Sequence, residues 1–180
     1  MLISISIAAV VGGLLLVIIV NSTGLFYKES SKVEQGLNTN DALAEVRKSI
    51  KQSSAIAVSY TESSVTYTSG ETQIVLKVPS LDSSGNNILS SFDYFVFFQD
   101  TSKLRFKIFP DTASSRKAQD RIFSNIVDSL VFKYLSSSNP PIEVAPEGAT
   151  KVRITLKLKQ KAGASYQTNI ATTEANLRND

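Results

Sequence analysis

The sequence begins with the apolar segment MLISISIAAVVGGLLLVIIVN, residues 1–21. Leu2–Val20 contains thirteen Leu, Ile and Val residues, and the first charged side chain is Lys28. As a helix, this stretch rises about 28 Å, close to the hydrocarbon thickness of a bilayer. Its aliphatic residues favour insertion by about 4–8 kcal/mol. The sequence therefore predicts a transmembrane helix over residues 1–21.

A cleaved secretory signal is the alternative interpretation of this segment. The apolar run is longer than the roughly 7–15 residues of such a signal, and no Lys or Arg precedes it. The residues that follow, NSTGLFY (21–27), offer no small-x-small cleavage site. A retained span is favoured, which predicts a single-pass protein of the cell (inner) membrane with the lipid bilayer as a partner.

Small residues recur every four positions within the predicted span. Ser4, Ala8 and Gly12 stack on one face of a helix, and Ala9 and Gly13 lie beside them. Small residues at this spacing allow close packing of helices in lipid. The other interpretation is that Gly and Ala are simply frequent in membrane helices. The spacing leaves both open.

A second, amphipathic part of the helix is predicted over residues 22–54. Leu43, Val46 and Ile50 recur at the spacing of one helix face, with charged residues between them. Gly36 weakens a helix by about 1 kcal/mol. We expect one long helix whose Leu43, Val46 and Ile50 cover the apolar face of a sheet.

Beyond residue 54 the apolar pattern changes to the alternation that is typical of strands. Segments 92–98 and 104–109 predict a hairpin, and residues 150–159 alternate most regularly. Ala118, Ile122 and Ile126 predict a short helix. Residues 55–180 are therefore expected to form an antiparallel sheet domain. The predicted fold class is α+β, with a long amino-terminal helix packed by its second half on that sheet.

The composition removes most catalytic and metal-binding chemistry. The chain has no Cys and no His, and its net charge is only +3. No Gly-x-Ser-x-Gly or phosphate-binding motif occurs, and the one Ser-x-x-Lys spacing lies within ASSRK (113–117). ASSRK (113–117) is interpreted as a helix cap, and DSSGNN (82–87) lacks the acidic spacing of a calcium loop. We expect no enzyme activity, no metal and no cofactor.

A basic face is the one candidate for ligand binding. It comprises alternating cations of one strand and its end, which are Lys151, Arg153, Lys157, Lys159 and Lys161. Such a strip favours DNA or another anionic polymer. No aromatic residues interleave with these cations, however, and Lys commonly protects the edge of a sheet. A membrane-anchored binding module outside any filament is the alternative function that this face supports.

Four segments together resemble the type IV pilin-like family. They are LISISIAAVVGGLLL (2–16), FDYFVFFQDTSKLRFKIFPD (92–111), NIVDSLVFKYL (125–135) and ANLRND (175–180). They resemble the mature start, the paired strands, a later strand and the ending of minor pilins and of J-type minor pseudopilins. The resemblance covers most of the chain and rests on the order of the segments. It implies the pilin-like fold, a long helix backing an antiparallel sheet.

The resemblance also implies a function and partners. It predicts a structural minor subunit of a type IV pilus, a type II secretion pseudopilus or a competence pilus, with its head outside the cytoplasm. The implied partners are other pilins or pseudopilins and an assembly platform membrane protein. The family's leader and Gly-Phe-Thr-Leu-Ile-Glu processing motif are absent from this sequence, so a prepilin peptidase is implied only if a leader lies upstream. No processing residue is assigned.

Overall fold

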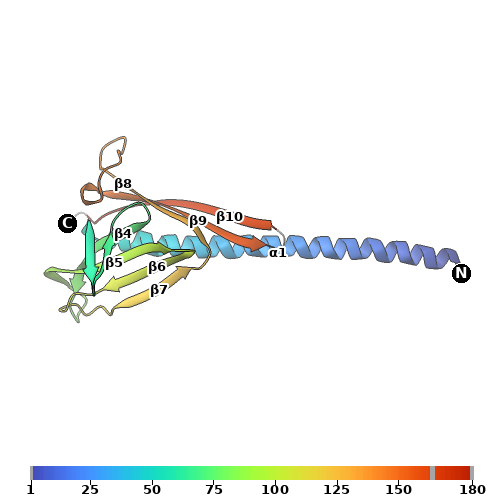
Figure 1. Cartoon of the computed structure of the whole chain (residues 1–180), viewed down its shortest axis with the longest axis horizontal. Helices are drawn as coiled ribbons and strands as arrows, with labels where there is room; N and C mark the ends of the chain where they lie inside the picture. Colours follow the sequence, from blue (N-terminus) through green and yellow to red (C-terminus); the bar gives the residue numbers. More distant parts are fainter. Residues whose placement is uncertain (1, 163–164, 179–180) are drawn as a thin grey trace.

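The computed structural model describes the backbone of residues 2–162 and 165–178; the side chains of residues 2–10, 27–29, 31–38 and 162 are outside the described part. One long helix is followed by a β-rich head (Figure 1). The elements are α1 (Leu2–Gln52), β1 (Ala55–Ile56), β2 (Ser59–Glu62), β3 (Val65–Thr68), β4 (Gln73–Leu81), β5 (Asn87–Asp100), β6 (Lys103–Phe109), β7 (Gln119–Ser124), β8 (Val127–Leu135), the 3-10 turn η1 (Pro146–Gly148), β9 (Lys151–Ala162) and β10 (Ser165–Asn176).

The helix α1 runs unbroken through Gly36 and divides into two parts by its surroundings. Its carboxy-terminal part crosses the head, while its amino-terminal part projects beyond it as a stalk (Figure 1). The helix ends where Ser53 folds back, because the Ser53 amide and hydroxyl both donate to the Ile50 carbonyl, at 3.1 and 2.6 Å. The chain then enters β1.

The strands of the head form three antiparallel sheets. Their orders are β1-β4-β5-β6-β7, β10-β9-β8 and β2-β3. The prediction of one antiparallel sheet is therefore wrong. Alternation within a strand shows which side chains are buried, but it does not show which other strand is the neighbour.

One core joins the helix to both larger sheets. Leu43, Val46 and Ile50 of α1 lie in the same buried cluster as the apolar faces of β4–β6 and β8–β9. In β9 the alternating residues Val152, Ile154, Leu156 and Leu158 are fully buried. A second, smaller cluster lies on the other face of the five-stranded sheet, between it and the β2–β3 hairpin. Both large sheets therefore pack against the buried half of α1.

The predicted short helix around residues 118–126 is wrong, because this segment forms the edge strand β7. Its pairing with β6 places Ile122 beside Arg105. Positions 118, 122 and 126 are four apart, and this spacing fits one face of a helix as well as one face of a strand. The long neighbouring strand β6 supplies the pairing that decides between them.

The predicted transmembrane helix over residues 1–21 is not supported either. Among the residues that the structure describes, no helix combines the length and the hydropathy needed to cross a membrane. This finding overturns the predicted membrane localisation and the predicted transmembrane first half of the helix. The fold is a mainly β head on one long helix, and not the α+β fold with a transmembrane half that the sequence predicted.

Candidate interaction site on the helix stalk

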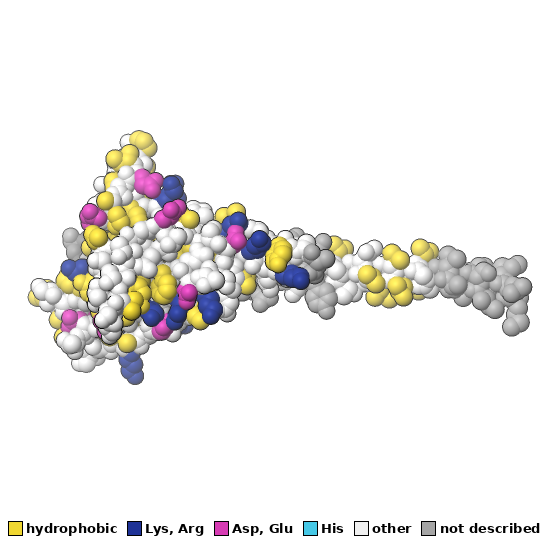
Figure 2. Space-filling view, viewed as in Figure 1, with side chains coloured by type: hydrophobic (Ala, Val, Ile, Leu, Met, Phe, Trp, Pro, Cys, Tyr) yellow, Lys and Arg dark blue, Asp and Glu magenta, His cyan; other side chains and the backbone are white. Residues whose placement is uncertain are grey.

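The stalk, defined here as the part of α1 from Val11 to Phe26, carries large apolar side chains that are more than half exposed, with Val11 at 49% the exception. From Leu14 to Val20 every side chain is aliphatic, and each is between 54 and 64% exposed. Leu25 and Phe26 follow at 62 and 71%. Figure 2 shows these residues as yellow patches along the rod beyond the head. Because seven consecutive residues cover the whole circumference of a helix, the stalk is apolar on all sides.

The stalk also carries three polar side chains, Asn21, Ser22 and Thr23, all of them exposed. The Thr23 hydroxyl donates to the Ile19 carbonyl at 2.8 Å, within the helix. The other backbone groups along this stretch of α1 are paired within the helix in the usual way. An all-round apolar helix of this kind is normally buried, since its exposed surface is unfavourable in water. The stalk is therefore chemically suited to contact other apolar helices.

The predicted packing residues of the stalk are only partly within the described residues. The side chains of Ser4, Ala8 and Ala9 lie outside them. Gly12 and Gly13 are described, and a Cβ atom placed on either would meet nothing within 4 Å. The two glycines therefore leave open space on the surface of α1, where the backbone of a neighbouring helix can approach.

The predicted helix-to-sheet residues are all inside the head. Val46 and Ile50 are fully buried, and Leu43 is 6% exposed. The opposite side of the same turns is exposed and basic, with Arg47, Lys48 and Lys51. The amphipathic pattern of this part of α1 thus corresponds to a buried and a solvated face.

The predicted basic face is largely neutralised by neighbours on the same sheet. Glu174 of β10 lies 2.7 Å from Arg153 Nε and 3.6 Å from Lys151 Nζ, and Asp128 lies 2.6 Å from Lys157 Nζ. Lys159 Nζ lies 5.0 Å from the centroid of the Tyr166 ring. A hydrogen bond from Lys157 lowers the pKa of Asp128, and one from Arg153 lowers the pKa of Glu174. Lys161, at the end of this strip, is exposed.

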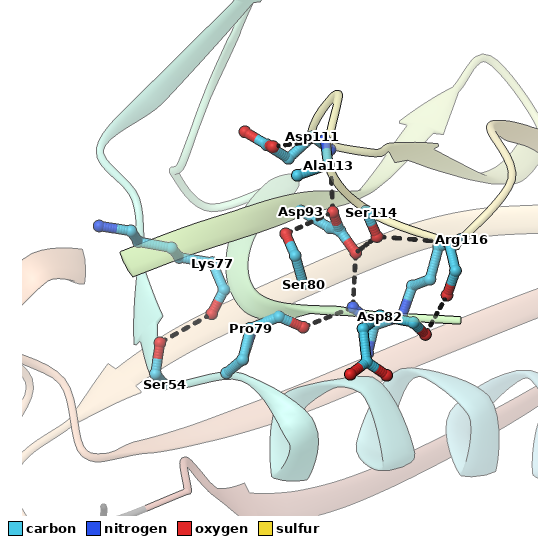
Figure 3. Close-up of polar contacts among 11 residues, drawn as sticks. Ser54, Lys77, Pro79, Ser80, Asp82, Asp93, Asp111, Ala113, Ser114 and Arg116 are labelled. Atoms are coloured by element: carbon cyan, nitrogen blue, oxygen red, sulfur yellow. Dashed lines mark hydrogen bonds and ion pairs between the residues drawn. The ribbon is translucent and has the colours of Figure 1, made fainter. Parts of the chain in front are cut away.

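A buried carboxylate, that of Asp93, connects β4, β5 and the β6–β7 connection. Asp93 of β5 is 0% exposed and accepts hydrogen bonds on both oxygens (Figure 3). The Ser80 hydroxyl and the Asp111 amide donate to Oδ1, at 2.8 and 2.9 Å. The Ser114 hydroxyl donates to Oδ2 at 2.9 Å, and Arg116 forms an ion pair with the same oxygen.

This cluster is structural, because every lone pair that the carboxylate offers is matched by a donor. Arg116 Nη1 also donates to the Pro79 carbonyl, so the β6–β7 connection is fixed to β4 and β5. The ASSRK segment (113–117) supplies Ser114 and Arg116, and its predicted role as a helix cap is wrong because no helix follows. An acidic residue inside an otherwise apolar strand, FDYFVFF (92–98), was the available signal.

The described residues contain no group of three or more acidic, Cys or His side chains arranged to hold a metal ion. Compared with models of protein families, with curated proteins and with solved structures, the chain matches none of them.

Proposed function

We propose that this chain is a structural subunit of a pilin-like filament, a type IV pilus or a type II secretion pseudopilus. In this proposal the stalks of neighbouring subunits pack in parallel and the β-rich heads lie around them. The observation that carries it is the exposed aliphatic circumference of α1 from Leu14 to Val20, projecting beyond the head. A helix with this surface needs other apolar surfaces around it.

The energy available from such packing is sufficient for assembly. Complete burial of one Leu, Ile or Val side chain contributes about 1.5–3 kcal/mol. The loss of translational and rotational freedom when two subunits associate costs about 4–15 kcal/mol. Burial of several of the stalk's aliphatic side chains therefore offsets that cost. Because neighbours in a parallel array use different surfaces of the same rod, the contacts are heterologous and can continue as a helical filament.

The order of the four segments that resemble minor pilins also supports this proposal. The alternative, an anion-binding module acting through the basic face, has weaker support. Four of its five cations, Lys151, Arg153, Lys157 and Lys159, already contact a carboxylate or an aromatic ring in the head. Binding a polyanion would therefore compete with contacts inside the protein.

The test compares two leucines that are both exposed, Leu16 on the stalk and Leu89 on the head, at 64 and 94%. A charge within a packed apolar bundle is strongly unfavourable. Leu16→Asp should therefore abolish assembly of the full chain, measured by sedimentation velocity and by electron microscopy of negatively stained particles. Leu89→Asp should assemble like the unmodified chain. Assembly of Leu16→Asp at the unmodified level would contradict the proposal.

A further inference from the structure

The strand β10 forms an open edge of its sheet. It pairs with β9 over twelve consecutive residue pairs without a register shift. In the sheet order β10-β9-β8 it is terminal, and Figure 1 shows its outer side free along most of its length. A long, regular edge strand presents a row of unpaired backbone groups that can pair with another strand.

The hydrogen-bond pattern shows which residues form that row. Leu177 donates its amide to Thr150 in the same register, so the odd-numbered residues of β10 face β9. The even-numbered residues, Tyr166, Thr168, Ile170, Thr172, Glu174 and Asn176, therefore direct their N–H and C=O groups outward. Arg178, the next outward position, donates its amide to the Ser53 carbonyl. Among the described residues, these six positions have no backbone partner on their outer side.

At the opposite edge of the same sheet, formed by β8, outward backbone groups have partners within the head, unlike those of β10. On β8, Leu130 donates its amide to the Gln99 side chain at 2.9 Å, and Phe132 donates to the Glu71 carbonyl at 2.7 Å. The Tyr134 carbonyl accepts from Val144 at 2.9 Å. Three successive outward positions of β8 are thus satisfied within the head.

The usual protections of an edge strand are missing from β10. Its sequence, SYQTNIATTEAN, contains no Lys, Arg or Pro, and Glu174 is its only charged residue. Glu174 is itself paired with Arg153. Two large apolar side chains stand on the exposed face of the strand, Tyr166 at 66% and Ile170 at 61%. The helix α1 packs on the other face of β10, where Ala171 and Ala175 point into the core. It therefore does not cover the face that carries Tyr166 and Ile170.

We propose that the outer edge of β10 pairs with the same edge of a second copy of this chain, as an antiparallel two-fold dimer. Beyond Asn176 the chain is tied to Ser53 through the Arg178 amide, so we place the symmetric overlap over the part of the edge away from that end, from Tyr166 to Glu174, centred on Ile170. In this register Ile170 lies opposite Ile170 of the second copy, Thr168 opposite Thr172, and Tyr166 opposite Glu174. In this register Ile170 pairs with an apolar side chain and Thr168 with another hydroxyl side chain, and no two like charges lie opposite each other.

This dimer is distinct from the filament of the proposed function and does not rest on it. The two-fold axis directs the two stalks in opposite directions, whereas the filament has parallel stalks. Two copies paired through β10 must therefore separate before both can enter one filament. Strand pairing is a contact of the head, and it is independent of the apolar residues of the stalk.

The test uses the absence of cysteine from the chain, so that each introduced thiol is the only one. In the proposed register the two Ile170 Cα atoms are about 5.5 Å apart, within the range of a disulfide. Ile170→Cys in the full chain, dispersed in a nonionic detergent and oxidised mildly, should form about tenfold more linked dimer than an unpaired thiol, because paired thiols have a high effective concentration. Val65→Cys, on an exposed strand at 53%, is the matched control.

Two further variants test the register. Thr168 and its counterpart in the second copy are offset by four residues, about 14 Å along the strand, too far for a disulfide. Thr168→Cys and Thr172→Cys should each give only the control level alone but form a linked dimer when mixed. Ile170→Cys dimer at the control level, or Thr168→Cys linking to itself, would overturn the proposal. So would loss of the Ile170→Cys dimer when Leu16→Asp is added, because the link would then depend on the stalk.

Discussion

Asp93 shows how one buried residue can fix the arrangement of a whole end of the head. A carboxylate without water is unfavourable unless donors surround it. Here two hydroxyls, one amide and the Arg116 guanidinium fill that role. The donors come from β4 and from the β6–β7 connection, which do not pair with each other, so the carboxylate holds these two segments together.

Replacement of Asp93 by Asn should destabilise the protein strongly. The amide removes the negative charge opposite Arg116 and turns one acceptor into a donor that faces other donors. We expect a loss of about 3 kcal/mol in the free energy of unfolding, measured by urea denaturation. Asp120→Asn is the control, because Asp120 also contacts two cations but its side chain is 44% exposed; it should cost less than about 1 kcal/mol. Equal losses in the two variants would contradict this role for Asp93.

Glu174 predicts a dependence of stability on pH. The hydrogen bond from Arg153 holds the pKa of Glu174 below its ordinary value. A lowered pKa in the folded state stabilises the fold above the pKa of the unfolded chain, about 4.3, and this contribution is lost as the pH falls through the folded value. Glu174→Gln should therefore melt at a lower temperature than the unmodified chain at pH 7, and the difference should shrink as the pH falls below the pKa of the unfolded chain. A difference that persists at acid pH would indicate packing as its cause.

At the scale of the elements, α1 has two parts with opposite requirements. Ile50 is fully buried in the head, whereas Ile19 on the stalk is 62% exposed. Truncating a buried Ile to Ala lowers the free energy of unfolding by about 2–5 kcal/mol. The same truncation at an exposed position changes it by no more than about 0.5 kcal/mol. Ile50→Ala should therefore lower the unfolding midpoint of the head and Ile19→Ala should not, as followed by near-ultraviolet circular dichroism in denaturant. A similar loss from Ile19→Ala would show that the stalk contributes to the fold of the head.

The elements also show where the sequence was sufficient and where it was not. Strict alternation in residues 150–159 gave the buried face of β9 correctly, since a period of two fits only a strand. The spacing of Ala118, Ile122 and Ile126 fits both periods, and only the partner strand β6 selects the strand. The division of the strands into separate sheets depends on contacts between distant segments, which alternation does not encode.

The candidate sites follow the same rule. The apolar composition of the stalk could be read directly, because it depends on consecutive residues. The Asp93 cluster unites residues 80, 93, 111, 114 and 116, and the pairing of the basic face with Asp128 and Glu174 joins three strands. Such clusters arise from the folded topology, so the pattern of charge along the sequence did not show which carboxylates pair with the candidate basic face.

At the scale of the whole molecule, the head and the stalk offer two kinds of association that can be distinguished. The stalk offers apolar side chains around a helix, and the head offers the backbone edge of β10. In the separate chain, a helix that lacks tertiary contacts opens readily. The amides of Val11–Phe26 should therefore exchange with solvent quickly, while those of buried residues 42–50 exchange slowly.

Assembly through the stalk should reverse this difference. When stalks pack together, opening of the helix requires loss of the apolar contacts, so the amides of Val11–Phe26 should become protected by about tenfold or more. Hydrogen exchange followed by mass spectrometry on associated and separate full chains measures this directly, and Leu16→Asp serves as the chain that does not associate. Protection confined to residues 166–174 would assign the association to strand pairing. Unchanged exchange along the stalk in associated chains would exclude it as the assembly surface.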